Sequence, residues 1–384
     1  MSIPPRIREL QEDAAIAQCD GRCLDAAILR EQAYHLARGH GMFALAFYLG
    51  VRTGTSWALA GKLDRKLAVL LEILQSPPPD VRSSDLFHAR ASLYEFFVYH
   101  RPNLERALRA LDELERMALA DPTLPHADVP YLRSELCELQ GRYAEALELL
   151  EISWMADSPI GFARYQWALY ATRVNLRLGR RGAAERWCEI LGLTNIDDAS
   201  SRASWHLMRG HLALWDQDVK GVAERSMDAE DAEAGLQIPE AEQRVLDLRI
   251  RALLLDPSRG DPHSPHHPAR ALMARRRARQ IQIDTLFDWR LLRIDYRLAA
   301  VRHAAGMAPV DDFWYSRPHL PPDWIRPVNG SDFQRRVLYT RRTAAYARRY
   351  AEYVDDCLQS DFRRREVQAR MERLDEILRA VAAR

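Results

Sequence analysis

A helical hairpin pattern recurs along this chain at nearly constant spacing, and this repeat constrains the fold more than any other feature. The clearest copy is residues 131–151, YLRSELCELQGRYAEALELLE, in which apolar residues recur three and four positions apart on both sides of Gly141. That spacing is typical of amphipathic helices, and glycine permits a tight reversal between two of them. The sequence therefore predicts an antiparallel helix pair here.

An alanine occupies a similar place in the second helix of each copy. The gaps between successive alanines are 42, 39, 39, 38 and 39 residues. The alanines are Ala26, Ala68, Ala107, Ala146, Ala184 and Ala223. A small side chain at this place lets the second helix cross the first closely. The regular period predicts stacked helix pairs that share one continuous core.

The repeat resembles the tetratricopeptide-repeat (TPR) superfamily in a divergent form. Residues 131–159 carry the TPR-like set Ser134, Gly141, Tyr143, Ala146 and Pro159. The period of 38–39 residues is longer than the TPR period of about 34. The resemblance covers residues 5–235 well and 236–305 loosely. It implies an all-α fold, a right-handed TPR-like α-solenoid of antiparallel helix pairs.

Beyond residue 235 prolines interrupt the repeat. Further helices are predicted over 269–281 and 284–306, and residues 333–384 contain neither Gly nor Pro. In that last segment an apolar stripe predicts long helices; its members are Val337, Ala344, Ala347, Ala351 and Val354, with Thr340 on the same line. We therefore predict a solenoid over 1–306, an aromatic and Pro-rich loop over 307–332, and C-terminal capping or dimerisation helices over 333–384.

Composition excludes several classes of protein. The longest apolar stretch without charge, between Arg38 and Arg52, holds 13 residues, whereas a membrane-spanning helix needs about 20. The N-terminus has no basic-then-apolar signal pattern. The five cysteines are scattered and odd in number, which fits reduced thiols. We expect a cytoplasmic protein.

The sequence contains no recognisable catalytic motif. Phosphate-binding glycine loops, Gly-x-Ser-x-Gly, His-Glu-x-x-His and paired Cys-x-x-Cys are all missing from it, so we expect no enzyme and no cofactor. The best metal candidate is the DPHSPHHP loop, with Asp261, His263, His266 and His267. Imidazoles and a carboxylate are zinc ligands, but a loop interrupted by proline provides no rigid support for them. A solvated loop is the favoured interpretation and a metal-dependent enzyme the less favoured one.

Charge is unevenly distributed. Residues 1–240 carry a formal charge of −8 and residues 241–384 one of +9, within a net charge of +1. Arginine runs in the basic half lie at 275–279, 341–342, 348–349 and 363–365. Such runs are compatible with phosphate contacts, so a nucleic-acid-associated regulator is an alternative function. With 52 arginines against three lysines, compositional bias is a competing explanation.

The strongest functional prediction concerns the inner wall of the solenoid. In TPR-like arrays the first helix of each pair lines the concave face, and aromatic anchors with a few charged neighbours are typical of peptide recognition. That register predicts a peptide- or protein-binding surface at Trp57, Phe96, Tyr99, Tyr131, Glu135, Tyr170, Arg173, His211 and Trp215. The alternative is that about half of these side chains pack between repeats.

The aromatic loop offers a further possibility. Its segment FWYSRPHLPPDW, with Phe313, Trp314, Tyr315 and Trp324, is too apolar for a free tether. It is expected either to pack on the solenoid or to occupy the groove as a plug. The sequence as a whole predicts a non-enzymatic scaffold or regulatory receptor for a peptide or protein partner, and a homodimer is also compatible with it.

Overall fold

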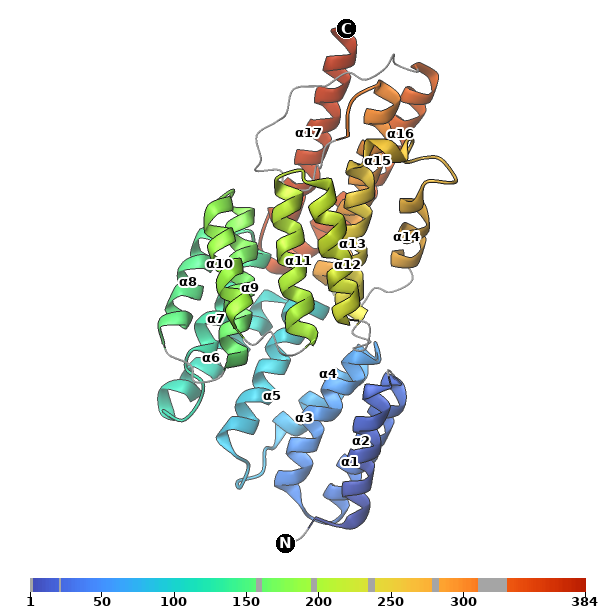
Figure 1. Cartoon of the computed structure of the whole chain (residues 1–384). Coiled ribbons are helices and arrows are strands. Elements are labelled where there is room, and N and C mark those ends of the chain that lie inside the picture. Colours follow the sequence, from blue (N-terminus) through green and yellow to red (C-terminus); the bar gives the residue numbers. More distant parts are fainter. Residues whose placement is uncertain are drawn as a thin grey trace. The chain divides into compact units, whose positions relative to one another are not determined.

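The computed structural model describes residues 3–20, 22–156, 161–194, 199–233, 239–277, 283–309 and 330–384. Seventeen α-helices account for most of these described residues, and no strand runs through them (Figure 1). Consecutive helices pack as antiparallel pairs. The predicted all-α fold of antiparallel helix pairs is therefore confirmed.

The chain divides into two compact units, Met1–Arg133 and Ser134–Arg384. Unit 1 contains α1 (Pro5–Cys19), α2 (Cys23–Gly39), α3 (Phe43–Leu59), α4 (Leu63–Gln75), α5 (Ser83–Glu95) and α6 (Leu104–Ala120), with a π-helical turn at Phe96–His100. Its main core gathers apolar side chains from α1 to α5, among them Ile7, Tyr34, Phe47 and Leu70.

Unit 2 contains the longer series of helices. The chain passes from unit 1 to unit 2 within α7 (Asp128–Leu139). There follow α8 (Tyr143–Met155), α9 (Gly161–Arg177), α10 (Arg181–Leu193), α11 (Ala199–Trp215), α12 (Val219–Glu233), α13 (Pro239–Leu255), α14 (Pro268–Arg277), α15 (Ile283–Ala305), α16 (Gly330–Leu358) and α17 (Phe362–Ala382). The predicted stripe of α16, from Val337 to Val354, is buried as expected.

The helix pairs are joined by one recurring type of turn. Gly141, between α7 and α8, has φ +75° and donates its N–H to the carbonyl oxygen of Glu138 at 2.9 Å, while the N–H of Arg142 reaches Cys137 O at 2.8 Å. This left-handed glycine closes a helix C-terminus with a Schellman-type pattern. The predicted reversal at Gly141 is therefore confirmed, and Gly179 has the same left-handed conformation, with φ +73°.

The register of the repeat is set by where each helix begins. Ala26, Ala107, Ala146 and Ala184 are each the fourth residue of their helix and are buried, as predicted. The predictions for Ala68 and Ala223 are wrong, because both are exposed. The fourth residues of α4 and α12 are instead Lys66 and Val222, which are buried. Counting from the helix start therefore locates the crossing position better than following alanine.

None of the described helices has both the length and the apolar character needed to cross a bilayer.

Candidate functional site

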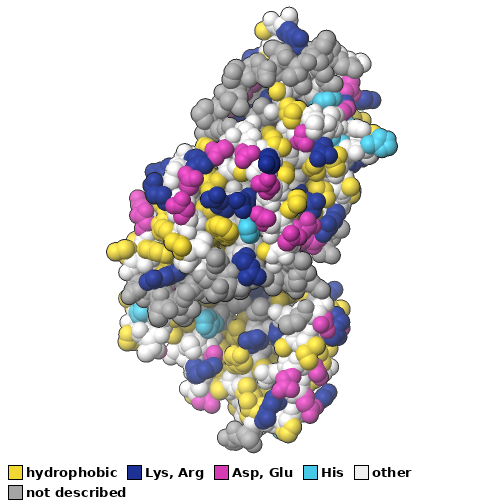
Figure 2. Space-filling model, viewed as in Figure 1, with side chains coloured by type: hydrophobic (Ala, Val, Ile, Leu, Met, Phe, Trp, Pro, Cys, Tyr) yellow, Lys and Arg dark blue, Asp and Glu magenta, His cyan; other side chains and the backbone are white. Residues whose placement is uncertain are grey.

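The first helices of successive pairs in unit 2 form one layer. Within this unit α9 packs against α11, α11 against α13, α13 against α15, and α15 against α17 (Figure 1). The term inner layer is used here for the side chains near α17 that come from α7, α9, α11, α13 and α15. Figure 2 shows charged and hydrophobic side chains interleaved over the α9–α13 part of the visible face.

One edge of the inner layer is a stacked ion pair. Arg173 on α9 donates to both carboxylate oxygens of Glu138, at 2.6 and 2.5 Å. The same guanidinium lies over the ring of Tyr170, 4.4 Å from its centroid. The side chain of Glu138 is 10% exposed, whereas that of Arg173 is 25% exposed. This arrangement holds a planar cation over an aromatic ring at an accessible edge.

The deeper part of the inner layer is a buried charge network. Asp295 on α15 accepts from Arg370 at 2.7 Å and from Arg251 at 3.1 Å. Arg370 also donates to Glu366 at 2.8 Å. The side chains of Asp295 and Arg251 are each 4% exposed, and those of Arg370 and Glu366 are 0% exposed. Buried charges of this kind are tolerated only when they are paired and hydrogen-bonded.

The C-terminal helices supply half of this network. The term elbow is used here for residues 358–370, which connect α16 to α17 and form the first turns of α17. Gln140 donates to the carbonyl oxygen of Leu358 at 2.8 Å, and Arg363 donates to Leu139 O at 2.9 Å. The Phe362 ring meets Tyr143 edge-on, with centroids 5.6 Å apart. The elbow is therefore docked on the α7–α8 turn, more than 200 residues away in sequence.

Two further contacts hold the elbow in place. Glu366 of α17 lies 3.6 Å from Arg177 of α9. Asp355, near the end of α16, is buried and accepts from the backbone N–H groups of Arg363 and Arg364 at 3.2 and 2.9 Å. These are two of the otherwise orphan donors of the α17 N-terminus. The elbow thus presents a capped helix start to the inner layer.

His211 on α11 lies among the inner-layer cations. Burial first, and then the positive charges of Arg251, Arg177, Arg244 and Arg173, together lower its pKa from 6.5 to about 3. The imidazole is therefore neutral at physiological pH. In the unfolded chain it takes up a proton near its ordinary pKa, so the unfolded state binds more protons than the folded state between about pH 6.5 and 3.

We predict that His211→Gln makes the protein more resistant to acid. The wild type should lose stability as pH falls from about 6.5 towards 3, because only its unfolded state protonates His211 over that window. Glutamine keeps a neutral polar side chain without this proton uptake. Urea unfolding at a series of pH values should give a smaller decline for the variant. Parallel pH profiles of variant and wild type would contradict the assignment.

The structure distributes the predicted binding residues unevenly. Trp57 and Phe96 are buried in unit 1, where Trp57 donates to Glu31 at 3.3 Å and packs with Ala27. Glu135 is buried in unit 2. These three side chains present little or no surface to a ligand, as the packing alternative anticipated. The half-buried members of the set are Tyr99, Tyr131, Tyr170, Arg173, His211 and Trp215.

Only part of the half-buried set lies together. Tyr170 and Arg173 stack on each other, and Arg173 lies within electrostatic range of His211. Trp215 packs against the unit 2 core. Tyr99 and Tyr131 belong to unit 1. Arg177, Arg251, Asp295 and the elbow were not predicted as site residues.

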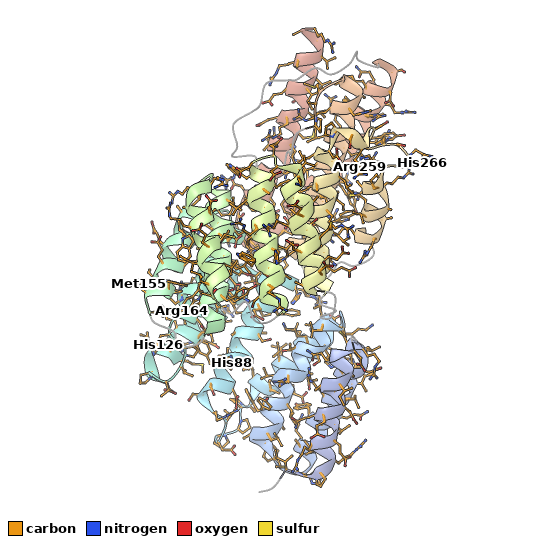
Figure 3. All side chains as sticks on the ribbon, viewed as in Figure 1. His88, His126, Met155, Arg164, Arg259 and His266 are labelled. Atoms are coloured by element: carbon orange, nitrogen blue, oxygen red, sulfur yellow. The ribbon has the colours of Figure 1, made fainter. Side chains whose placement is uncertain are left out.

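The histidine loop between α13 and α14 is tied to neighbouring helices. Arg336 on α16 donates to both oxygens of Asp261, at 2.6 and 2.7 Å. Burial raises the pKa of Asp261, but these bonds and one from the His263 N–H outweigh it and lower the pKa to about 2. His267 is buried, and Figure 3 shows His266 at the outer edge of the loop. No group of three or more potential metal-ligating His, Cys, Asp or Glu side chains occurs among the described residues.

Much of the arginine-rich half serves internal pairing. Arg275 pairs with Glu242 at 2.6 Å, and the buried Arg276 pairs with Asp247 at 2.7 Å while lying over the Trp289 ring. Arg363, Arg370 and Arg373 are also buried. Binding of a polyanion by this half stays a prediction for its exposed arginines. Most of the predicted 307–332 loop, including FWYSRPHLPPDW, lies outside the described residues, and so does its proposed role as a plug.

Comparison with known proteins gives little beyond the fold. No protein-family model matches the chain, and no curated protein does. Among solved structures it is similar to the crystal structure of the TPR domain of P58(IPK), at 12% identity, covering 98% of this chain and 99% of that chain, with a TM-score of 0.24. A TM-score this low carries no argument about a shared arrangement, so the all-α fold rests on the paired helices and their turns.

Proposed function

We propose that this chain is a non-enzymatic scaffold or regulatory receptor that binds a protein segment on the inner layer of unit 2. The observation that carries the proposal is the docked elbow. A helical segment with Arg363, Glu366 and Arg370 already lies against this layer through a hydrogen bond and ion pairs. Its Phe362 ring contacts Tyr143 at the adjoining start of α8. A surface with these complementary features can recognise a helix from another protein in the same way.

The accessible edge of the inner layer is the proposed contact for the partner. Tyr170 and Arg173 are half-buried, and their stacking restricts the guanidinium before a partner arrives. Tyrosine and arginine are the residue types that most often dominate binding energy in protein interfaces. A partner carboxylate can share Arg173 with Glu138, because a guanidinium has five N–H donors.

Affinity purification from extracts of the native source tests the proposal. The wild-type chain should enrich a defined set of proteins, and Tyr170→Ala/Arg173→Ala should reduce their recovery about tenfold or more, as expected when two central anchors are lost. Lys220→Ala is the matched control, because this side chain on α12 is 87% exposed and lies outside the inner layer. Circular dichroism should verify that both variants are folded.

Two results would count against the proposal. In the first, the folded double variant recovers every protein at the wild-type level. In the second, Lys220→Ala lowers recovery as much as the double variant does.

A further inference from the structure

The outer side of α8 is apolar and acidic. α8 contains three glutamates and neither lysine nor arginine. Ile152 is 55% and Met155 80% exposed, and Figure 3 shows Met155 at the outer edge of the helix. Glu148 and Glu151 are also exposed. At about 100° per residue these four side chains lie within an arc of about 100° around the helix. The term α8 face is used here for these four residues.

The carboxylates of the α8 face have no counter-charge in the described part of the chain. Neither Glu148 nor Glu151 makes an ion pair or a side-chain hydrogen bond there. Large apolar side chains that gather at a surface are typical of an interaction site. Apolar side chains beside unpaired carboxylates fit a partner that has an apolar centre and a basic rim.

A groove with those properties lies between α16 and α17. Its volume is about 440 Å³, within the usual range for binding sites of about 300–1,000 Å³. The apolar lining residues are Ala344, Ala345, Val367 and Met371. The basic lining residues are Arg341, Arg348, Arg364 and Arg365. The side chains of these arginines are 40–64% exposed. The groove therefore combines an apolar floor with a basic rim.

The rim arginines have local partners but retain donors for a further carboxylate. Arg348 lies 3.1 Å from Glu352, and Arg365 lies 3.0 Å from Asp361. All four of these side chains are at least 44% exposed, and exposed ion pairs contribute little to stability. A guanidinium has five N–H donors. A carboxylate from another molecule can therefore bind at the rim without displacing the local one.

We propose that the α8 face of one copy of the chain docks in this groove of a second copy. Ile152 and Met155 lie on the apolar floor, and Glu148 and Glu151 meet the rim arginines. The two surfaces match in length, because residues 148–155 of α8 and 341–348 of α16 each rise by about 10 Å. Each surface supplies what the other lacks.

The charge of the chain favours a second copy as the occupant. Residues 1–240, which include α8, carry −8, and residues 241–384, which form the groove, carry +9. Complementary charges speed the encounter and fix the register. Two different surfaces meet, so the contact is heterologous, and copies add head to tail unless a ring closes. A contact of this length buries less than the roughly 1,200 Å² of a standard interface, so association is weak and concentration-dependent.

Sedimentation velocity on the full chain tests the docking. Between about 1 and about 100 µM the average mass should rise above that of the monomer, as expected for a micromolar Kd. Glu148→Arg/Glu151→Arg should raise the Kd at least tenfold, because like charges then meet. Arg341→Glu/Arg365→Glu should do the same. Glu224→Arg, the same exchange at an exposed position of α12, should leave the Kd unchanged.

Exchanging the charges on both surfaces of one chain is the decisive variant. With all four substitutions at residues 148, 151, 341 and 365, opposite charges meet again and association should return. Circular dichroism should verify that every variant is folded. The proposal is overturned if the wild type is monomeric throughout, or if the fourfold variant associates no better than either double variant. It is also overturned if Glu224→Arg weakens association as much as they do.

Two single-cysteine chains test the register. Ile152 and Ala345 lie near the middle of the two matched spans, so they meet whichever way α8 runs along the groove. A mixture of Ile152→Cys and Ala345→Cys chains should form a disulfide between residues 152 and 345 under mild oxidation, as peptide mapping would show. Leu193→Cys, at a position of α10 that is 86% exposed, is the control in place of Ile152→Cys. Equal or faster linkage of residues 193 and 345 would overturn the register.

Discussion

Replacing Asp295 with alanine should lower the free energy of unfolding of unit 2 by about 3–5 kcal/mol. The carboxylate is the shared partner of Arg251 and Arg370, both buried. Its removal takes a buried carboxylate away from two guanidinium groups in the interior, while Arg370 keeps its ion pair with Glu366. Urea unfolding followed by circular dichroism measures the loss.

Two companion variants test whether the loss of stability comes from the burial of the charges. Glu105→Ala breaks an exposed ion pair with Arg109 on α6, and such pairs contribute less than about 1 kcal/mol. Replacing the Arg251–Asp295 pair, as Arg251→Met/Asp295→Leu, should restore much of the lost stability, because apolar side chains of similar volume carry no desolvation penalty and Arg370 keeps its pair with Glu366. If Asp295→Ala unfolded at the wild-type urea concentration, the buried network would not exist in solution.

Gly141→Ala should destabilise unit 2 by about 2–5 kcal/mol, the second large effect, because two costs combine. The glycine has φ +75°, where an added Cβ costs about 1–2 kcal/mol. A Cβ there would also lie 2.7 Å from the Phe362 ring, so the elbow must shift, at a cost typical of overpacking, about 1–3 kcal/mol.

Gly61→Ala is the matched control for the backbone cost. Gly61 has φ +71°, and a Cβ there meets nothing within 4 Å. Its substitution should cost only the backbone part, about 1–2 kcal/mol. In the Gly141→Ala background, Phe362→Ala should be less damaging than in the wild type, because it removes the clash as well as the ring contact. Equal losses for Gly141→Ala and Gly61→Ala would show that the elbow does not rest on the α7–α8 turn.

The helix pairs were predictable because their causes are local. Amphipathic spacing and glycine turns are set within about twenty residues, and Gly141 forms the turn expected of it. One local signal was missed: α2, α3 and α4 begin at residues 23, 43 and 63. The fourth residues of these helices are Ala26, Ala46 and Lys66. The crossing position in α4 therefore holds a lysine, which a register based on alanine misses.

The site was less predictable because its parts come together only in three dimensions. Arg173 and Glu138 lie 35 residues apart, on the first helices of successive pairs. A register for the inner wall could therefore predict Arg173 as a site residue. Arg363 meets Leu139 across 224 residues, and no periodicity reports such a contact. Trp57 and Phe96 have the aromatic character of a binding residue, but burial depends on neighbours that the sequence pattern does not reveal.

The most direct measurement is a cysteine pair placed across the docked elbow. The Ser360 hydroxyl lies 3.5 Å from the backbone oxygen of Gln140. The variant Gln140→Cys/Ser360→Cys should therefore form an intramolecular disulfide rapidly under mild oxidation, with peptide mapping joining the two positions. Gln140→Cys/Gln368→Cys is the control, with its second cysteine on an exposed position of α17. Linkage of the first pair well ahead of the control is the predicted result, and equal or slower linkage would contradict a C-terminal elbow bound on the inner layer.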